Sequence, residues 1–184
     1  MARRIFSESV FLMLEANPAK ERRLKEVRAE ALGFIHYAIG VVGSESRPSV
    51  RFFQMGSGSS VLEEQSDVSR NIIESPMRTL DEVLEEKNFS DVHLIKLDVQ
   101  GYELEILKGA PKALNTAQVV LLEVSFLQYN KGAPLFADVV QFMGEHGFVT
   151  YDIGSLVRWH GDDSLLQADL IFVRKDSSLR PMRF

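Results

Sequence analysis

Apolar runs recur along the chain and alternate with segments of helical periodicity. The runs most typical of buried strands are 10–14, 34–42, 50–55, 93–97, 119–124, 148–153 and 168–174. Between several of them, as in 18–33 and 134–147, apolar residues return every three or four positions. Solidly apolar strands alternating with amphipathic helices are typical of a parallel sheet covered on both faces. The pattern therefore predicts an α/β fold.

Turn and capping residues suggest where these elements begin and end. Asn17 is a good helix N-cap and Gly33 is well placed to stop that helix. Thr79 and Glu82 have the spacing of a capping box. The stretch 10–42 is accordingly expected to form a right-handed βαβ unit. No helix separates the last two strands, so we expect them to form an antiparallel hairpin at one end of the sheet.

Length, charge and cysteine content narrow the class of protein. A chain of 184 residues most naturally forms a single domain, here 1–184 with a tail at 176–184. A net charge of −5 argues against a nucleic-acid partner, which needs a basic surface. The absence of cysteine excludes disulfides, thiolate metal sites and a cysteine nucleophile. The run 10–14 is too short for a signal-peptide core or a membrane span, so we expect a soluble, cytoplasmic protein.

Three carboxylates stand at or near the C-terminal ends of apolar runs: Glu15, Asp98 and Glu123. In a doubly wound sheet these ends converge on one crevice, where ligands bind. Glu15 precedes the helix that begins near Asn17, and a carboxylate there suits a ribose diol because it can accept two hydroxyl hydrogen bonds. The alternative for each acid is a loop cap or a surface charge. The four histidines lack ligand spacing and no third ligand joins Asp98 and Glu123, so no metal site is predicted.

The central stretch 94–110, LIKLDVQGYELEILKGA, resembles the signature of the FkbM family of S-adenosylmethionine-dependent methyltransferases. That signature is usually close to I-K-I-D-V-E-G-x-E-x-x-V-L-K-G-A. The segments VFLMLEANP, MRTLDEVLEE, VVLLEVSF and ADLIFVRK resemble other parts of the family, so the resemblance spans nearly the whole chain. It implies a Rossmann-like class I methyltransferase sheet, mostly parallel with a C-terminal antiparallel hairpin, and S-adenosylmethionine as the cosubstrate.

The resemblance also implies roles for particular residues. Five positions would face the cosubstrate: Glu15, Asn17, Ala38, Ile39 and Asp98. Glu15 would bind the ribose hydroxyls, and Asp98 would lie beside the transferring methyl. Glu123 would face the acceptor, which the family implies is a hydroxyl on a sugar, lipid or polyketide-type molecule. Such a transfer needs a base for the hydroxyl proton, and Asp98 is the first candidate and Glu123 the second.

The sequence departs from the family pattern in two places. Gln100 stands where the family usually has glutamate, so a carboxylate contact there becomes an amide contact. The family's first strand and glycine-rich turn have no counterpart before Val10, and residues 1–6 resemble the end of the helix that follows that turn. In the family that strand lies between those at 10–14 and 93–97. The gap could close by direct pairing, be filled by another chain, or reflect a start site placed too far downstream.

Two consequences follow from the absent turn. The turn allows backbone amides to approach the cosubstrate closely, so we expect these 184 residues to bind S-adenosylmethionine weakly or not at all. The leading interpretation is an O-directed methyltransferase domain with a small-molecule, glycan or lipid acceptor and no membrane span. The alternative is a non-catalytic relic that serves as a binding or assembly module and self-associates through exposed strand edges. A nicotinamide-dependent dehydrogenase would share the fold but lacks its fingerprint here.

Overall fold

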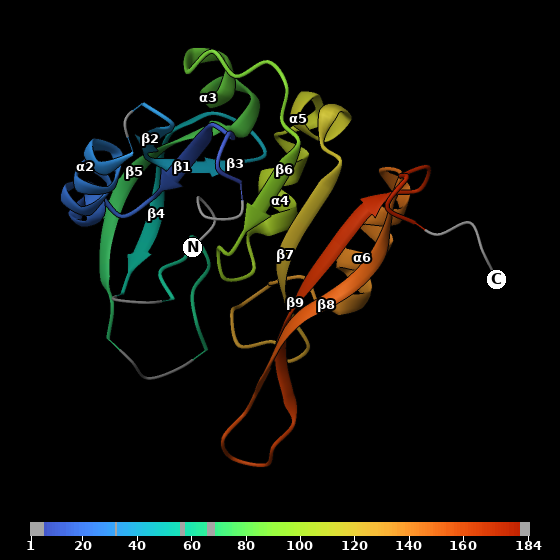
Figure 1. Cartoon of the computed structure of the whole chain (residues 1–184). Coiled ribbons are helices and arrows are strands. Elements are labelled where there is room, and N and C mark those ends of the chain that lie inside the picture. The colour runs from blue at the N-terminus through green and yellow to red at the C-terminus, as the bar shows by residue number, and fades with distance from the viewer. Residues whose placement is uncertain (1–5, 32, 56–57, 66–68, 181–184) are drawn as a thin grey trace.

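The computed structural model describes residues 6–31, 33–55, 58–65 and 69–180, and these residues form three sheets with helices packed around them (Figure 1). A two-stranded parallel sheet contains β1 (Phe11–Glu15) and β2 (Ile35–Ile39). A three-stranded sheet has the order β3-β5-β4, with β3 (Val41–Gly43), β4 (Arg47–Gln54) and β5 (Asn71–Thr79). A four-stranded sheet has the order β6-β7-β9-β8, with β6 (Leu94–Leu97), β7 (Val119–Ser125), β8 (Phe148–Arg158) and β9 (Leu165–Arg174).

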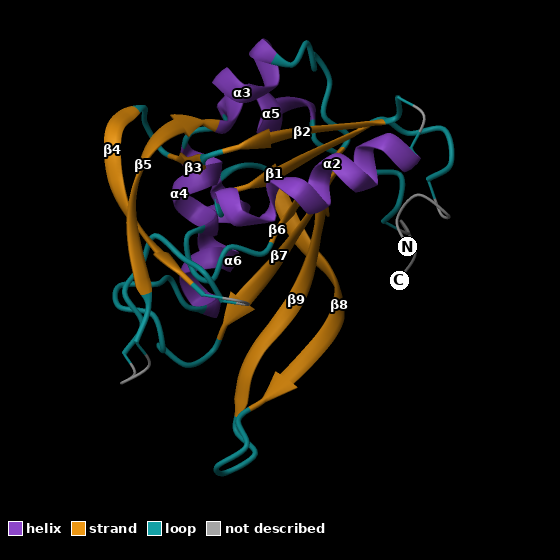
Figure 2. Ribbon diagram, turned by 90° about the vertical axis from the view of Figure 1, so that its left-hand side faces the viewer, coloured by secondary structure: helices purple, strands orange, loops and turns teal. Residues whose placement is uncertain are grey.

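The helices are short. They are the 3₁₀ turn η1 (Pro18–Lys20), α2 (Glu21–Glu30), α3 (Leu80–Glu86), α4 (Glu103–Lys108), α5 (Pro111–Thr116) and α6 (Phe136–Glu145). The α2 helix lies along the β1–β2 sheet (Figure 2), where the Tyr37 hydroxyl donates to the Glu21 carboxylate at 3.2 Å. The predicted capping box at α3 is confirmed, because the Thr79 side chain accepts from the Glu82 amide and Glu82 accepts in return from the Thr79 amide. No helix in the described ranges is long and apolar enough to cross a bilayer.

The main core lies between the four-stranded sheet and the helices α3 to α6. Its largest fully buried side chains are Ile106, Leu107, Val120, Leu122, Val124, Met143, Phe148, Leu170 and Phe172. Leu12 and Leu14 of β1 pack against the edge of this core from outside it. A smaller core of Val41, Phe52 and Met77 holds the three-stranded sheet together. Since the hydrophobic contribution scales with buried apolar area, most of it comes from the four-stranded half.

The run 34–42, predicted as one strand, is two strands in different sheets. Gly40 separates them with a φ of 141°, which a residue with a Cβ rarely adopts. Its amide donates to the Glu15 carbonyl at 3.0 Å and so ends the β1–β2 ladder. The chain then continues as β3, which pairs in parallel with β5. The prediction was wrong because apolar residues continue on both sides of Gly40, and this pattern does not reveal a change of sheet.

The strand β5 was not predicted, and its sequence explains why. Pro76 lies within it, and proline has no amide hydrogen for a ladder bond. The register of β4 shifts at this point, since Arg47 pairs with Met77 and Val50 pairs with Ser75. Two residues of β4 therefore stand opposite Pro76, so the missing donor falls in a bulge.

The α/β prediction is confirmed in its coarse form, whereas a mostly parallel sheet is not. The β1–β2, β3–β5 and β6–β7 pairs are parallel, but the β4–β5, β7–β9 and β8–β9 pairs are antiparallel. The β8–β9 pair is the predicted C-terminal hairpin, which extends away from the rest of the molecule (Figure 1). Of the predicted tail, 181–184 lies outside the described residues.

The strands predicted to flank the absent first strand do not pair with each other. Within the described ranges, β1 pairs with β2 alone and β6 pairs with β7 alone. Direct closure of the gap is therefore not observed, and each strand keeps one edge without a ladder partner. The helix end predicted at 1–6 lies outside the described residues except for Phe6.

Candidate functional site

The structure brings two of the three predicted carboxylates together. Asp98 directly follows β6, and the parallel pairing of Leu97 with Leu122 places Glu123 beside it on β7. The side-chain amide of Gln100 donates to Asp98 Oδ1 at 3.2 Å and to Glu123 Oε2 at 2.7 Å. The residue that departs from the family pattern is therefore the one that joins the two acids.

The turn that carries Asp98 and Gln100 depends on left-handed backbone and a buried acid. Gln100 has a φ of 59° and Gly101 a φ of 92°. The Glu103 side chain, which is 3% exposed, accepts from the Val99 amide at 3.0 Å and the Gly101 amide at 3.2 Å. A Cβ on Gly101 would lie 2.6 Å from the Ala133 Cβ. Glycine is thus required there both by conformation and by space.

Three further side chains close the cluster from distant parts of the chain. The Tyr129 hydroxyl donates to Gln100 Oε1 at 2.9 Å. The Gln167 amide donates to Glu123 Oε2 at 2.8 Å and lies 2.7 Å from the Tyr129 hydroxyl. The Asn130 amide donates to the Gln100 carbonyl at 2.7 Å. We refer to Asp98, Gln100, Glu123, Tyr129 and Gln167 as the acidic cluster.

Sequence reasoning did not identify Tyr129 or Gln167, because no local pattern marks them. Gln167 reaches Glu123 through the antiparallel pairing of β9 with β7, in which Ser125 stands opposite Gln167. Tyr129 lies in the loop that follows β7. The available signal is Gln167 itself, a polar residue near the start of the otherwise apolar β9. It points to the cluster only when β7 and β9 are known to be neighbours.

The environment changes the acid–base properties of the cluster. Burial raises the pKa of Glu123 to about 7, and the negative charges of Asp98, Glu103 and Asp169 act in the same direction. The hydrogen bond from Gln167 opposes this rise. Burial is also the main reason that the pKa of Tyr129 is raised to about 12. Glu123 therefore exchanges its proton near neutral pH, whereas the Tyr129 hydroxyl keeps its proton.

Asp98 is more open than Glu123. Its side chain is 48% exposed, and Lys96 Nζ lies 3.4 Å from its Oδ2. Since both partners are half exposed, this ion pair contributes little to stability. Its effect is to place a positive charge beside the carboxylate.

The predicted cosubstrate residues near Glu15 form a second, separate group. Glu15 Oε1 accepts from the Asn17 amide at 2.8 Å, and Lys20 Nζ lies 3.7 Å from Oε2. The Asn17 side chain is the predicted N-cap, here of η1, since its Oδ1 accepts from the Ala19 amide at 3.0 Å. The same oxygen accepts from Gln54 of β4 at 3.0 Å.

Ala38 and Ile39 stand opposite Leu14 and Glu15 in the β1–β2 ladder, and both are half-buried. We refer to Glu15, Asn17, Ala38 and Ile39 as the Glu15 group. In the part of the chain that the structure describes, no hydrogen bond or ion pair joins this group to the acidic cluster.

Two open cavities, of about 320 Å³ and 310 Å³, lie near the acidic cluster but do not include it. Both are lined by Leu62 and Tyr102, and neither is lined by Glu15, Asp98 or Glu123. Within the described ranges, no three histidine, aspartate or glutamate side chains are arranged to hold a metal ion.

Comparison with known proteins identifies the family. Two solved structures resemble the chain, with the titles "A Pericyclic Reaction enzyme" and "The structure of LepI complex with SAM". Their TM-scores are 0.37 and 0.38, each is 8% identical in sequence, and each match covers 95% of this chain. The chain spans 39% of the length of either protein. No curated protein matches the sequence.

A family model described as "Methyltransferase FkbM domain" matches residues 2–150. The matched range contains the signature 94–110, the whole Glu15 group and every member of the acidic cluster except Gln167. The resemblance predicted from the sequence is thereby confirmed. The chain belongs to the FkbM methyltransferase family.

Proposed function

We propose that this chain is a methyltransferase domain of Rossmann-like ancestry that uses S-adenosylmethionine to methylate a hydroxyl group. The acceptor class that the family implies is a sugar, a lipid or a polyketide-type molecule. One observation carries the proposal: Asp98 and Glu123 lie at the adjacent carboxyl ends of β6 and β7 and share the amide of Gln100. Ligands of open α/β sheets bind at such strand ends.

The chemistry of the Glu15 group fits the cosubstrate in part. The Glu15 side chain is 25% exposed at the end of β1, so its carboxylate can accept hydroxyl hydrogen bonds from a ribose. Together with Asn17, Ala38, Ile39 and Asp98, it would hold S-adenosylmethionine, which supplies an electrophilic methyl group when bound.

Glu123 is the better candidate for the base, although sequence reasoning ranked Asp98 first. A general base works best when its pKa lies near the operating pH, and the pKa of Glu123 is about 7. Asp98 is paired with Lys96 and accepts from Gln100. In this proposal Glu123 takes the proton of the acceptor hydroxyl, while Asp98 faces the reacting methyl group as a fixed negative charge.

The cosubstrate site can be tested without knowledge of the acceptor. The ¹⁵N-labelled chain would be titrated with S-adenosylhomocysteine and followed by NMR. We expect saturable shifts at the amides of Glu15, Ile39 and Asp98. Glu15→Gln should abolish these shifts, because it removes the negative charge that accepts the ribose hydroxyls.

The matched control is Arg22→Gln on α2. The Arg22 side chain is 92% exposed, so this substitution should leave the titration unchanged. Shifts confined to other parts of the chain, or identical titrations of the Glu15→Gln variant and the parent, would contradict the proposed site.

The alternative function, a non-catalytic assembly module, is favoured by one observation. The strands β1 and β6 each keep an edge without a ladder partner among the described residues. Such edges can pair with another copy of the chain. A dimer in light scattering combined with no response to S-adenosylhomocysteine would favour this alternative.

A further inference from the structure

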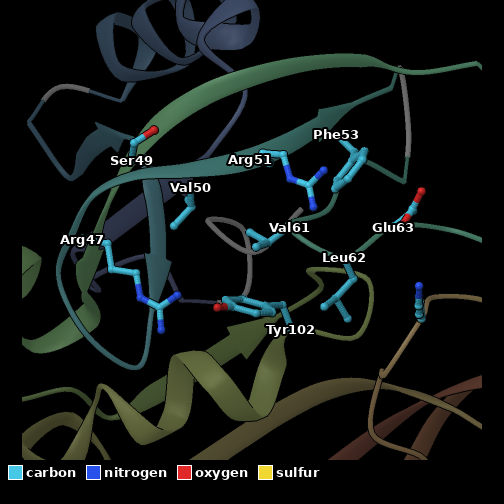
Figure 3. Close-up of a pocket in the computed structure, with 10 residues that line it drawn as sticks. Arg47, Ser49, Val50, Arg51, Phe53, Val61, Leu62, Glu63 and Tyr102 are labelled. Atoms are coloured by element: carbon cyan, nitrogen blue, oxygen red, sulfur yellow. The ribbon is translucent and has the colours of Figure 1, made fainter.

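The larger of the two cavities, which does not include the acidic cluster, combines basic and apolar side chains. It is bounded by β4, by the segment that follows Ser60 and by the first residue before α4 (Figure 3). The residues that give it its chemical character are Arg47, Arg51, Phe53, Val61, Tyr102 and Lys131. Its volume of about 320 Å³ is in the range of small-molecule sites.

The charges around the cavity are mostly positive. The lining contains three cations, Arg47, Arg51 and Lys131, and one carboxylate, Glu63, on a chain whose net charge is −5. The overall composition is acidic, so it does not account for this local excess of positive charge. A cluster of this sign attracts anions.

The three cations differ in the interactions that they already make within the protein. Arg47 Nε donates to the Glu45 carboxylate at 2.8 Å, in an exposed pair that solvent screens. Arg51 and Lys131 form no ion pair with any carboxylate in the described ranges. The Arg51 guanidinium lies over the Phe53 ring at 5.8 Å, a contact that positions the group without using its N–H donors.

The walls of the cavity are apolar and held in place. Phe53 is 6% exposed, and Val50, Val61 and the Tyr102 ring are half-buried. The Tyr102 hydroxyl donates to the Met77 sulfur at 3.7 Å, so its ring rather than its hydroxyl is available to a ligand. These surfaces would accommodate an aromatic or aliphatic group attached to the anion.

Hydrogen bonds tie this cavity to the turn that carries the acidic cluster. The Ser60 hydroxyl, which is 2% exposed, donates to the Gln100 carbonyl at 3.3 Å and accepts from the Leu62 amide at 3.1 Å. The Lys131 amide donates to the Glu63 carbonyl at 2.8 Å. The two loops that hold the lining residues are therefore fixed against each other before any ligand arrives, which lowers the entropic cost of binding.

We infer that this cavity binds a phosphate monoester that carries an apolar substituent. Such a monoester has a second pKa of about 6 and is close to a dianion at neutral pH, so it suits Arg51 and Lys131, the two lining cations that form no ion pair in the described ranges. Arginine suits phosphate because its planar N–H groups can bind two oxygens at once. The inference does not depend on methyl transfer, since the cavity shares no residue with the Glu15 group or the acidic cluster.

The first experiment uses phenyl phosphate as the probe and the full chain at neutral pH and low salt, followed by NMR. We expect saturable shifts of the Val61 methyl groups and the Tyr102 amide. Inorganic phosphate, which lacks the ring, and benzoate, which carries a single charge, should each bind about tenfold more weakly. No saturable shift with phenyl phosphate, or benzoate binding as tightly as phenyl phosphate, would overturn the inference.

The second experiment assigns the contacts. Arg51→Gln and Lys131→Gln should each weaken phenyl phosphate binding about tenfold. Both side chains are exposed, so the variants should fold, and Arg22→Gln again serves as the surface control. Unchanged affinity in both variants would contradict the site. A sedimentation assay with phosphatidylcholine vesicles, with and without phosphatidic acid, distinguishes a lipid phosphate, which would recruit the chain to the vesicles, from a soluble ester, which alone would bind.

Discussion

The acidic cluster and the Glu15 group differ in how the chain holds them. In the acidic cluster, Gln100 and Gln167 donate to the same carboxylate, and Gln167 is 44 residues from Glu123 in sequence. In the Glu15 group, the side-chain contacts of Glu15 come from residues two and five positions away, and the Asn17 side chain also accepts from the distant Gln54. The comparison shows that the side chains of the acidic cluster are joined by long-range pairing, whereas the Glu15 side chain is held by near neighbours in sequence.

The strands that carry the two groups also differ in burial, since β7 of the acidic cluster is more buried than β1 of the Glu15 group. Val120 and Leu122 of β7 are 0% exposed, because β7 has a neighbour on each side and helices against one face. In β1, which has one ladder partner, Met13 is 37% exposed and no residue is fully buried. A strand with partners on both sides buries more apolar area and contributes more to stability.

The largest expected effect tests this difference in burial directly. Leu122→Ala should lower the free energy of unfolding by about 4 kcal/mol, because it leaves a cavity in the main core. Leu14→Ala, the matched change in β1, should cost only about 1 kcal/mol because that side chain is half-buried at the edge of the core. Urea unfolding of the two variants measures both values. Equal losses would show that β1 is as well supported as β7.

An effect of intermediate size is expected at the turn of the acidic cluster. Gly101→Ala should cost about 3 kcal/mol, since the new Cβ would have an unfavourable φ and would clash with Ala133. Gly132→Ala is the matched control, because Gly132 also has a positive φ but nothing lies within 4 Å of its Cβ position. That variant should lose about 1 kcal/mol from backbone strain alone. Thermal unfolding would separate the two costs, and identical losses would show that packing against Ala133 is unimportant.

The smallest effect concerns the proton of Glu123. Its pKa is raised from 4.5 to about 7 on folding, so the folded state binds this proton more tightly than the unfolded chain does. The stabilisation is complete below the unfolded pKa and is lost as the pH rises through about 7. The Glu123→Gln variant cannot lose a proton here, so it should become about 1 kcal/mol more stable than the parent at alkaline pH, after allowance for solvent screening.

The measurement is urea unfolding across the pH range from acidic to mildly alkaline. Glu30→Gln, which changes an exposed carboxylate on α2, is the control and should follow the parent. If the Glu123→Gln variant and the parent gave parallel curves, the raised pKa of Glu123 and its role as a base would both be contradicted.

Local signals predicted the parts of the structure that depend on neighbouring residues. The cap at Asn17 and the capping box of Thr79 and Glu82 are present, because a cap is made within one turn of chain. The β8–β9 hairpin is also as expected, since two strands joined without a helix must turn back. The division of 34–42 at Gly40 and the strand that contains Pro76 were missed. In both cases a partner strand far away in sequence decided the outcome.

By itself, the sequence determined the family and the positions of the carboxylates at the strand ends, because apolar runs and their end residues are local properties of the chain. Only the tertiary structure decided that Gln100 joins Asp98 to Glu123, that Tyr129 and Gln167 complete this cluster, and that Glu15 stands apart from it. The physical reason is that these contacts depend on which strands pair and in which register. Register is set by packing over the whole sheet rather than by any one segment.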